Sequence, residues 1–296
     1  MDQKSNMAVT AKTHASRDVA VALTLSSIVA VQSGSALATG LFAALGPLGT
    51  VFLRAVFGAL ALVALTRGAT LRWRGRPHRD VFLLGLAVAG VNLFFFAALD
   101  RLPLGITVTL EFVGPLAVAL LGSRRPRDLL WALLAAAGIV LLTRGGGDID
   151  PLGVLLALAA GACWGAYIVQ SDRVGAVAPG IGGATTAAVI SAILVAPFGI
   201  VQGGAELLSP PHLAVAAAVG LLSTTIPYVF EMEALRRLPR PTFGVLMSLE
   251  PAVAALIGLI ALSQGLSGLE VVAIGLVVVA SAGALREAGA PPPHDG

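Results

Sequence analysis

Long apolar runs, separated by short polar or Gly/Pro-rich connections, occupy nearly the whole chain. A helix that crosses a lipid bilayer needs about 20 consecutive, mostly apolar residues. Ten runs approach that length: residues 18–41, 47–66, 81–99, 105–121, 128–143, 152–170, 181–202, 212–233, 242–262 and 267–285. The first run is too long for a removed signal peptide and lacks a small-residue cleavage site. The pattern predicts an all-α integral membrane protein with ten transmembrane helices, of which the fourth and fifth are short.

Composition supports a membrane protein. Hydrophobic residues make up 57% of the chain and charged residues 12%, whereas soluble domains are about 25% charged. So many apolar side chains exceed what the core of one soluble domain can bury. The low aromatic content of 5% and the 35 glycines fit helices that approach one another closely in lipid.

Residue types that usually carry catalysis or bind cofactors are scarce. The one cysteine, Cys163, excludes an internal disulfide. The four histidines lie in the tails or at the edges of the runs: His14, His78, His212 and His294. No HExxH, GxSxG, phosphate-loop or paired-cysteine motif occurs. We therefore expect no catalytic residue, no metal site and no cofactor, and we attribute the pI of 9.6 to topology rather than to nucleic-acid binding.

Basic residues concentrate on alternate connections. If the N-terminus is inside, the inner segments hold 16 of the 19 Lys and Arg residues, including the cluster LRWRGRPHRD at 71–80. The outer connections hold Arg101 and Arg144, and Arg54 lies within the second run. Because cytoplasmic loops carry the excess of Lys and Arg, both termini are predicted to be cytoplasmic. Residues 1–17 and 286–296 are expected to be disordered tails.

An internal repeat appears when the chain is shifted by 136 residues. Residues 98–120 (ALDRLPLGITVTLEFVGPLAVAL) then match 234–256 (ALRRLPRPTFGVLMSLEPAVAAL) at nine of 23 positions. The shared AL-x-RLP is the most specific part, and chance matching of Ala and Leu is the alternative explanation. The copies lie five helices apart, so they face opposite ways. This predicts two inverted five-helix repeats, 18–147 and 148–285, an arrangement typical of secondary transporters with a binding site near the membrane midplane.

The chain resembles the EamA-type branch of the drug/metabolite transporter superfamily, in particular its bacterial inner-membrane amino-acid exporters. The resembling stretches include VQSGSALATGLF (31–42), LEFVGPLAVAL (110–120) followed by SRRP, GACWGAYIV (161–169) and STTIPYVFEMEALRRLP (223–239). The resemblance implies a ten-helix fold, export of small neutral amino acids such as threonine or homoserine, coupling to protons, and a place in the bacterial inner membrane. One departure is Gln264, where such exporters usually carry an acidic residue.

Three glutamates at membrane depth are candidates for proton coupling. Glu111 lies about seven residues into its run, or roughly 10 Å deep. An ionised carboxylate there costs several kcal/mol unless it is paired, hydrated or protonated, and a carboxyl that exchanges its proton suits a proton-coupled exporter. Glu250 and Glu231 are the other two. The alternatives are a purely structural hydrogen bond for Glu111, and ion pairs with Arg236 and Arg237 for Glu231.

Substrate contacts are predicted from polar and amphipathic side chains within the runs. Arg54 either pairs with a buried glutamate, or receives a substrate carboxylate through its planar guanidinium, or extends to the outer surface. The other candidates are Gln32, Ser33, Asn92, Trp164, Tyr167 and Tyr228. Each of these has an ordinary helix–helix contact as its alternative role.

Two prolines in matching places, Pro115 and Pro251, are expected to break the fourth and ninth helices. Each removes one backbone hydrogen bond. A carbonyl freed in this way is tolerated within the membrane where it meets a neighbouring helix or lines a hydrated cavity.

The expected partners are an amino acid, protons and the lipid bilayer, and the oligomeric state is open. An exporter of other amphiphilic metabolites or drugs is the main alternative within the superfamily. An intramembrane enzyme is disfavoured because the runs contain isolated glutamates, and aspartate occurs in them only at their first residues, Asp18 and Asp128. A purely structural subunit is disfavoured because buried Glu111, Glu250 and Arg54 would destabilise it without serving a function.

Overall fold

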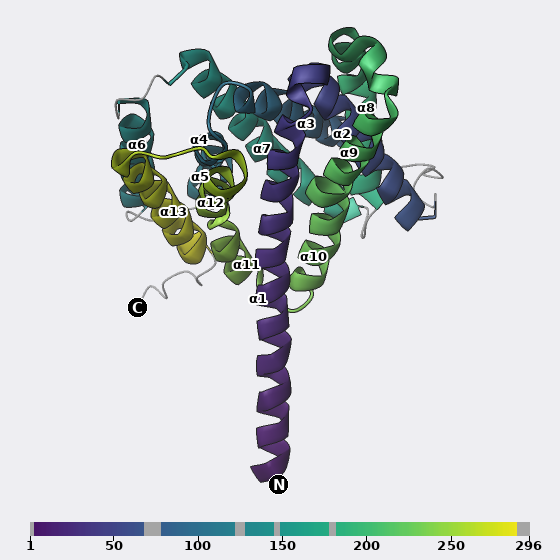
Figure 1. The fold of residues 1–296 in the computed structure, drawn as a ribbon. Coiled ribbons are helices and arrows are strands. Elements are labelled where there is room, and N and C mark those ends of the chain that lie inside the picture. Colours follow the sequence, from purple (N-terminus) through teal and green to yellow (C-terminus); the bar gives the residue numbers. More distant parts are fainter. Residues whose placement is uncertain (1–2, 68–77, 122–127, 145–148, 178–181, 289–296) are drawn as a thin grey trace.

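The computed structural model describes residues 3–67, 78–121, 128–144, 149–177 and 182–288, and within these ranges the chain is helical without strands (Figure 1). The elements are α1 (Gln3–Thr39), α2 (Phe42–Leu65), α3 (His78–Leu99), α4 (Leu104–Glu111), α5 (Val113–Leu121), α6 (Asp128–Arg144), α7 (Pro151–Val177), α8 (Gly182–Gly203), η2 (Gly204–Leu208), α9 (Pro210–Gly220), η3 (Leu221–Thr225), α10 (Ile226–Leu235), α11 (Arg240–Met247), α12 (Glu250–Leu262) and α13 (Gly268–Ala288). The first turns of α1 project beyond the rest of the bundle.

Nine helical segments in the described ranges are long and apolar enough to cross a membrane. They correspond to nine of the ten expected runs. The remaining run, 128–143, forms α6, whose apolar part, Leu129–Leu142, is shorter than a full span. The chain is therefore a multi-pass membrane protein. Most of the arginine cluster at 71–80, the SRRP stretch at 123–126 and the end of the C-terminal tail lie outside the described residues.

Two spans are divided near their prolines. The fourth span breaks at Phe112 between α4 and α5, and the ninth breaks at Ser248–Leu249 between α11 and α12. An α-helical carbonyl accepts a hydrogen bond from the residue four positions later, which is Pro115 for the Glu111 carbonyl and Pro251 for the Met247 carbonyl. Proline has no N–H to donate, so both carbonyls are released where the helices divide.

The two divided spans share their backbone geometry at a separation of 136 residues. Both α4 and α11 follow a proline in extended conformation, Pro103 with ψ 145° and Pro239 with ψ 140°. Five backbone hydrogen bonds also recur at this separation, from Asp100 N–H to Phe96 C=O through Phe112 N–H to Val108 C=O in the first copy. The recurrence extends beyond the AL-x-RLP identity, because it includes positions where the side chains differ.

Helix packing follows the same correspondence. A shift of 136 residues relates α1 to α7, α2 to α8, α3 to α9–α10 and α6 to α13. Among the described elements, α3 packs on α7 and α10 packs on α1, while α5 packs on α7 and α12 packs on α1. Pairs that correspond to each other across the shift also pack directly, as α2 does on α8 and α6 on α13. The contacts named here between the halves therefore have counterparts.

Apolar packing and polar contacts between connections join the helices at one end of the bundle. Phe96, Leu99 and Leu104 belong to a buried cluster that joins α1, α3, α4, α8 and α12. The Gln264 side-chain oxygen accepts a 2.9 Å hydrogen bond from Leu104 N–H, at the first turn of α4. Arg101 donates to Asp150 at 2.7 Å, and this hydrogen bond lowers the pKa of the Asp150 carboxyl.

Candidate functional site

A cavity of about 330 Å³ lies at the centre of the bundle. Its walls come from α1, α2, α3, α4, α7, α8, η3, α10, α11 and α12, so both halves of the chain contribute. Nine of the residues predicted from sequence line it: Gln32, Arg54, Asn92, Glu111, Trp164, Tyr167, Tyr228, Glu231 and Glu250. Ser33 does not line it, whereas Ser35 does. The helical period explains the difference, since neighbouring residues face different sides of a helix.

Arg54 is held inside the cavity by α3 and η3. Its Nε donates to Ser223 Oγ at 2.7 Å, and one terminal nitrogen donates to the Ser223 carbonyl at 2.9 Å. The other terminal nitrogen donates to Asn92 Oδ1, and Asn92 is itself fixed by donating to the Val88 carbonyl at 2.9 Å. The guanidinium also lies 5.3 Å from the centre of the Phe96 ring. Arg54 therefore points inward rather than to the outer surface.

The Ser223 carbonyl is available to Arg54 because of a proline. In an α-helix this carbonyl would accept from residue 227, which is Pro227 and has no N–H. Around this position the eighth span forms a π-helical turn, η3, between α9 and α10, and such turns often occur at functional sites. Sequence analysis missed Ser223, although its position four residues before a proline within a span was a readable signal.

Glu111 is the last residue of α4 and is 6% exposed. It interacts electrostatically with Arg54, so the cavity brings together the acid and base that lie 57 residues apart in the chain. Its backbone carbonyl, released by Pro115, lies against α7 at Gly161. A β-carbon at Gly161 would sit 2.6 Å from this oxygen, so the absence of a side chain at Gly161 lets α7 support the break.

Glu250 is buried to the same degree but occupies a different place on its broken helix. It is the first residue of α12, where the helix dipole favours a negative charge. Across the 136-residue shift, the position equivalent to Glu111 is Met247, which also lines the cavity. The halves thus present a carboxylate and a thioether at equivalent positions, while Glu250 matches Gly114.

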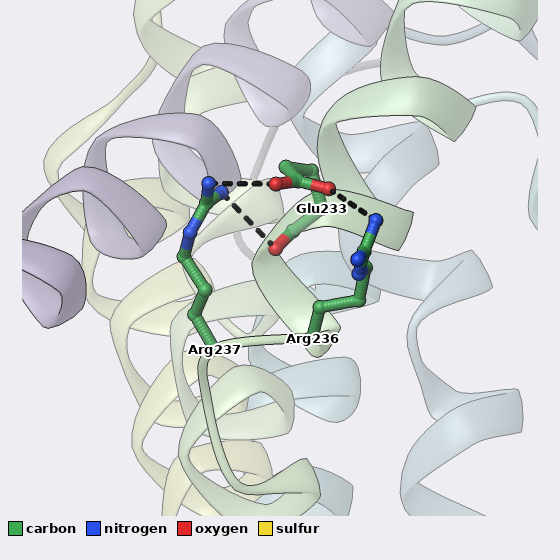
Figure 2. A network of polar contacts seen from close by, with 3 residues as sticks. All are labelled: Glu233, Arg236 and Arg237. Carbon is green, nitrogen blue, oxygen red and sulfur yellow. Dashed lines mark hydrogen bonds and ion pairs between the residues drawn. The ribbon is translucent and has the colours of Figure 1, made fainter.

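The two glutamates of α10 have separate roles. Glu233 forms ion pairs with Arg236 at 3.3 Å and Arg237 at 2.6 Å, and Figure 2 shows it between the two arginines. The ion pairs with Arg236 and Arg237, which the sequence offered as the alternative role of Glu231, are therefore formed by its neighbour Glu233. Glu231 instead faces the cavity, and its Oε1 accepts a 2.7 Å hydrogen bond from Ser27 of α1.

A second cavity of about 240 Å³ continues the first toward the end of the bundle where α7 ends and α8 begins. Tyr167, Tyr228 and Glu231 line both cavities. The apolar cluster that contains Phe96 and Leu104 adjoins the central cavity. Together the two cavities form a passage from the middle of the bundle toward the end where α7 ends and α8 begins.

Comparison with known proteins fits a passage of this kind. Residues 151–286 match the EamA-like transporter family. The chain is 43% identical over 264 residues to the threonine/homoserine exporter RhtA of Salmonella typhimurium, which covers 88% of each chain. It is 40% identical over 268 residues to the exporter of the same name from Escherichia coli K12, covering 89% of this chain and 90% of that one.

The chain belongs to the EamA-like transporter family. An uncharacterized transporter of Bacillus subtilis, YwfM, is 28% identical over 240 residues, which is 76% of this chain and 81% of that one. A crystal structure of a protein that is 25% identical superposes with a TM-score of 0.62 and covers 90% of this chain and 96% of the other. As an EamA-like protein the chain is a transporter and not an enzyme.

The contact between Glu111 and Gly161 leads to a prediction. Gly161→Ala should push α4 and α5 away from α7, because the added β-carbon meets backbone rather than a flexible side chain. Overpacking of this kind costs about 1–3 kcal/mol, which exceeds the gain of up to about 1 kcal/mol from replacing a helical glycine. We expect a lower melting temperature in detergent and impaired transport.

The matched control is Gly275→Ala in α13, where a β-carbon meets nothing within 4 Å. This variant should keep or raise the melting temperature. Equal stability of the two variants would contradict the role of Gly161 in supporting the broken helix.

Proposed function

We propose that this protein exports small neutral amino acids, such as threonine and homoserine, from the bacterial cytoplasm across the inner membrane in exchange for protons. One observation carries the proposal. The central cavity places a guanidinium, Arg54, among three carboxylates, Glu111, Glu231 and Glu250, inside walls that also carry many apolar side chains. An amino acid carries one group of each charge, and this cavity offers a partner to both.

The names of the relatives support the amino-acid class. The proteins from Salmonella and Escherichia that are 40–43% identical to this chain are called threonine/homoserine exporters. Their similarity covers nearly nine-tenths of the chain. The substrate carboxylate meets Arg54, which has five N–H donors and uses three of them for Ser223 and Asn92.

The transport mechanism that fits this fold is alternating access between two inverted five-helix repeats, residues 18–147 and 148–285. The matching breaks, the recurring backbone hydrogen bonds and the exchanged packing pairs support this division. In this arrangement α6 is the tenth crossing, with the residues before 18 and after 285 in the cytoplasm. The end of the passage where α7 ends and α8 begins then faces the cytoplasm, which is the side where an exporter loads its substrate.

Proton exchange follows from the charges in the cavity. Arg54 is the one basic side chain among the described residues that line it, so three ionised carboxylates would leave an excess of negative charge. Protons and the substrate ammonium group are the cations that relieve this excess. When substrate enters from the cytoplasm it displaces a proton, and Glu111, beside Arg54, is the carboxyl that exchanges it.

A second candidate is the export of other amphiphilic metabolites or drugs. The size of the cavity and its apolar lining, which includes Phe95, Phe96, Trp164 and Met247, favour it. Vesicles that release such a solute, but not threonine, in response to a proton gradient would decide for this alternative.

Glu111→Gln tests the coupling. An amide cannot exchange a proton, so efflux of threonine driven by a pH gradient in proteoliposomes should fall about a hundredfold, the lower end of the effect of a positioned proton-transfer group. Exchange of threonine across the membrane without net proton movement should persist. Glu233→Gln, in the ion pairs of Figure 2, is the control. Unchanged pH-driven efflux at matched expression would remove Glu111 from the coupling role.

Arg54→Lys tests the guanidinium. Lysine keeps the charge but cannot donate at once to Ser223 Oγ, the Ser223 carbonyl and Asn92 from a planar group. We expect the KM for threonine to rise about tenfold, the value of one charge-assisted hydrogen bond. Arg236→Lys, at a side chain that is 76% exposed, should behave as wild type. Full retention of transport in Arg54→Lys would show that only the charge matters.

Reporter fusions test the orientation. Green fluorescent protein fused to the C-terminus should fluoresce in cells, because it folds in the cytoplasm, whereas alkaline phosphatase fused there should be inactive. Phosphatase inserted beside Asp150, in an outer connection of this topology, should be active. An active phosphatase at the C-terminus would overturn the orientation.

A further inference from the structure

Ser191 of α8 lines the central cavity and has no assigned role. Its side chain is 1% exposed, and its Oγ has no hydrogen-bond partner among the described residues. Other hydroxyl groups within the helices bond to the carbonyl four residues earlier, as Thr109, Thr186 and Ser223 do at 2.6–3.0 Å. Ser191 does not make this local contact, so its hydroxyl remains available.

Leaving such a group unpaired has a cost. A buried donor or acceptor without a partner destabilises a protein by about 1–3 kcal/mol. The other cavity residues of α8 are Ala184, Ala187 and Ala188, so Ser191 carries the one polar side-chain atom that this helix presents to the cavity. The side chains beside Ser191 on this face of α8 are therefore small and apolar.

The polar groups of the cavity differ in what they can bind. Arg54 only donates hydrogen bonds, so it suits a carboxylate. The ionised glutamates only accept, and the buried Gln32 Oε1, which also has no partner among the described residues, accepts as well. These acceptors suit an ammonium group. Ser191 both donates and accepts, which matches a hydroxyl group.

We propose that Ser191 binds the side-chain hydroxyl of the substrate and makes the transporter selective for small hydroxyl-bearing amino acids over apolar ones of the same shape. This inference rests on the proposed amino-acid transport. Sites that bind a hydroxyl discriminate against analogues lacking it, because the polar group of the protein is then left unpaired. Threonine and homoserine share a hydroxyl that valine and norvaline replace with a methyl group.

The test compares the two isosteric substrate pairs in proteoliposomes. Wild type should prefer threonine to valine and homoserine to norvaline in kcat/KM. In Ser191→Ala the preference should fall about fivefold, the value of one hydrogen bond of roughly 1 kcal/mol, mainly through a higher KM for the hydroxylated substrate. Valine transport should stay the same or improve. Ser191→Thr keeps a hydroxyl and should preserve the preference.

Ser281→Ala is the matched control. Ser281 of α13 is also fully buried and its Oγ also has no partner among the described residues, but it does not line the cavity. It should leave the substrate preference unchanged. An unchanged preference in Ser191→Ala, or an equal loss in Ser281→Ala, would overturn the role of Ser191 while leaving amino-acid export intact. A wild-type protein that moves none of the four amino acids would overturn the proposed function itself.

Discussion

The hydrogen bonds that hold Arg54 in the centre of the bundle are the interaction on which the rest of the site depends. A guanidinium at membrane depth is costly unless it is paired and hydrogen-bonded, and here three separate elements supply its partners. Asn92 comes from α3, Ser223 from the π-helical turn, and the opposing charge from Glu111 at the end of α4. Two of these partners exist because a proline has altered a helix: Pro227 releases the Ser223 carbonyl, and the span containing Glu111 divides before Pro115.

The broken helices show how one scaffold produces an asymmetric cavity. Their breaks correspond across 136 residues, and so do the hydrogen bonds that precede them. The charged residues do not correspond, since Glu111 matches Met247 and Glu250 matches Gly114. Gly114 lies in close contact with the Gly161 backbone, where no carboxylate would fit. The backbone symmetry supports exchange of conformations between the halves, and the side chains adapt the cavity to a substrate with two different ends.

Much of this arrangement was readable from sequence, and the exceptions have physical reasons. Apolar length and the rarity of buried charge identified the spans and the residues Arg54, Glu111, Glu231 and Glu250. Periodicity alone did not fix helix rotation, so Ser33 was predicted as a substrate contact although it does not line the cavity. Ser191 and Ser223 were missed because serine is common at helix contacts in membranes. Their importance depends on whether a local carbonyl satisfies the hydroxyl and on which carbonyl a distant proline leaves open, and these are properties of the folded backbone.

The hydrogen bond between Gln264 and the first turn of α4 determines how this end of the bundle responds to pH. A carboxylate at this position would gain or lose strength as a hydrogen-bond acceptor when the acidity of the surrounding medium changed. The amide of glutamine does not titrate, so its bond to Leu104 N–H is the same in acidic and neutral surroundings. A change of pH therefore leaves this hydrogen bond unchanged and acts on the protein only through groups that gain or lose a proton.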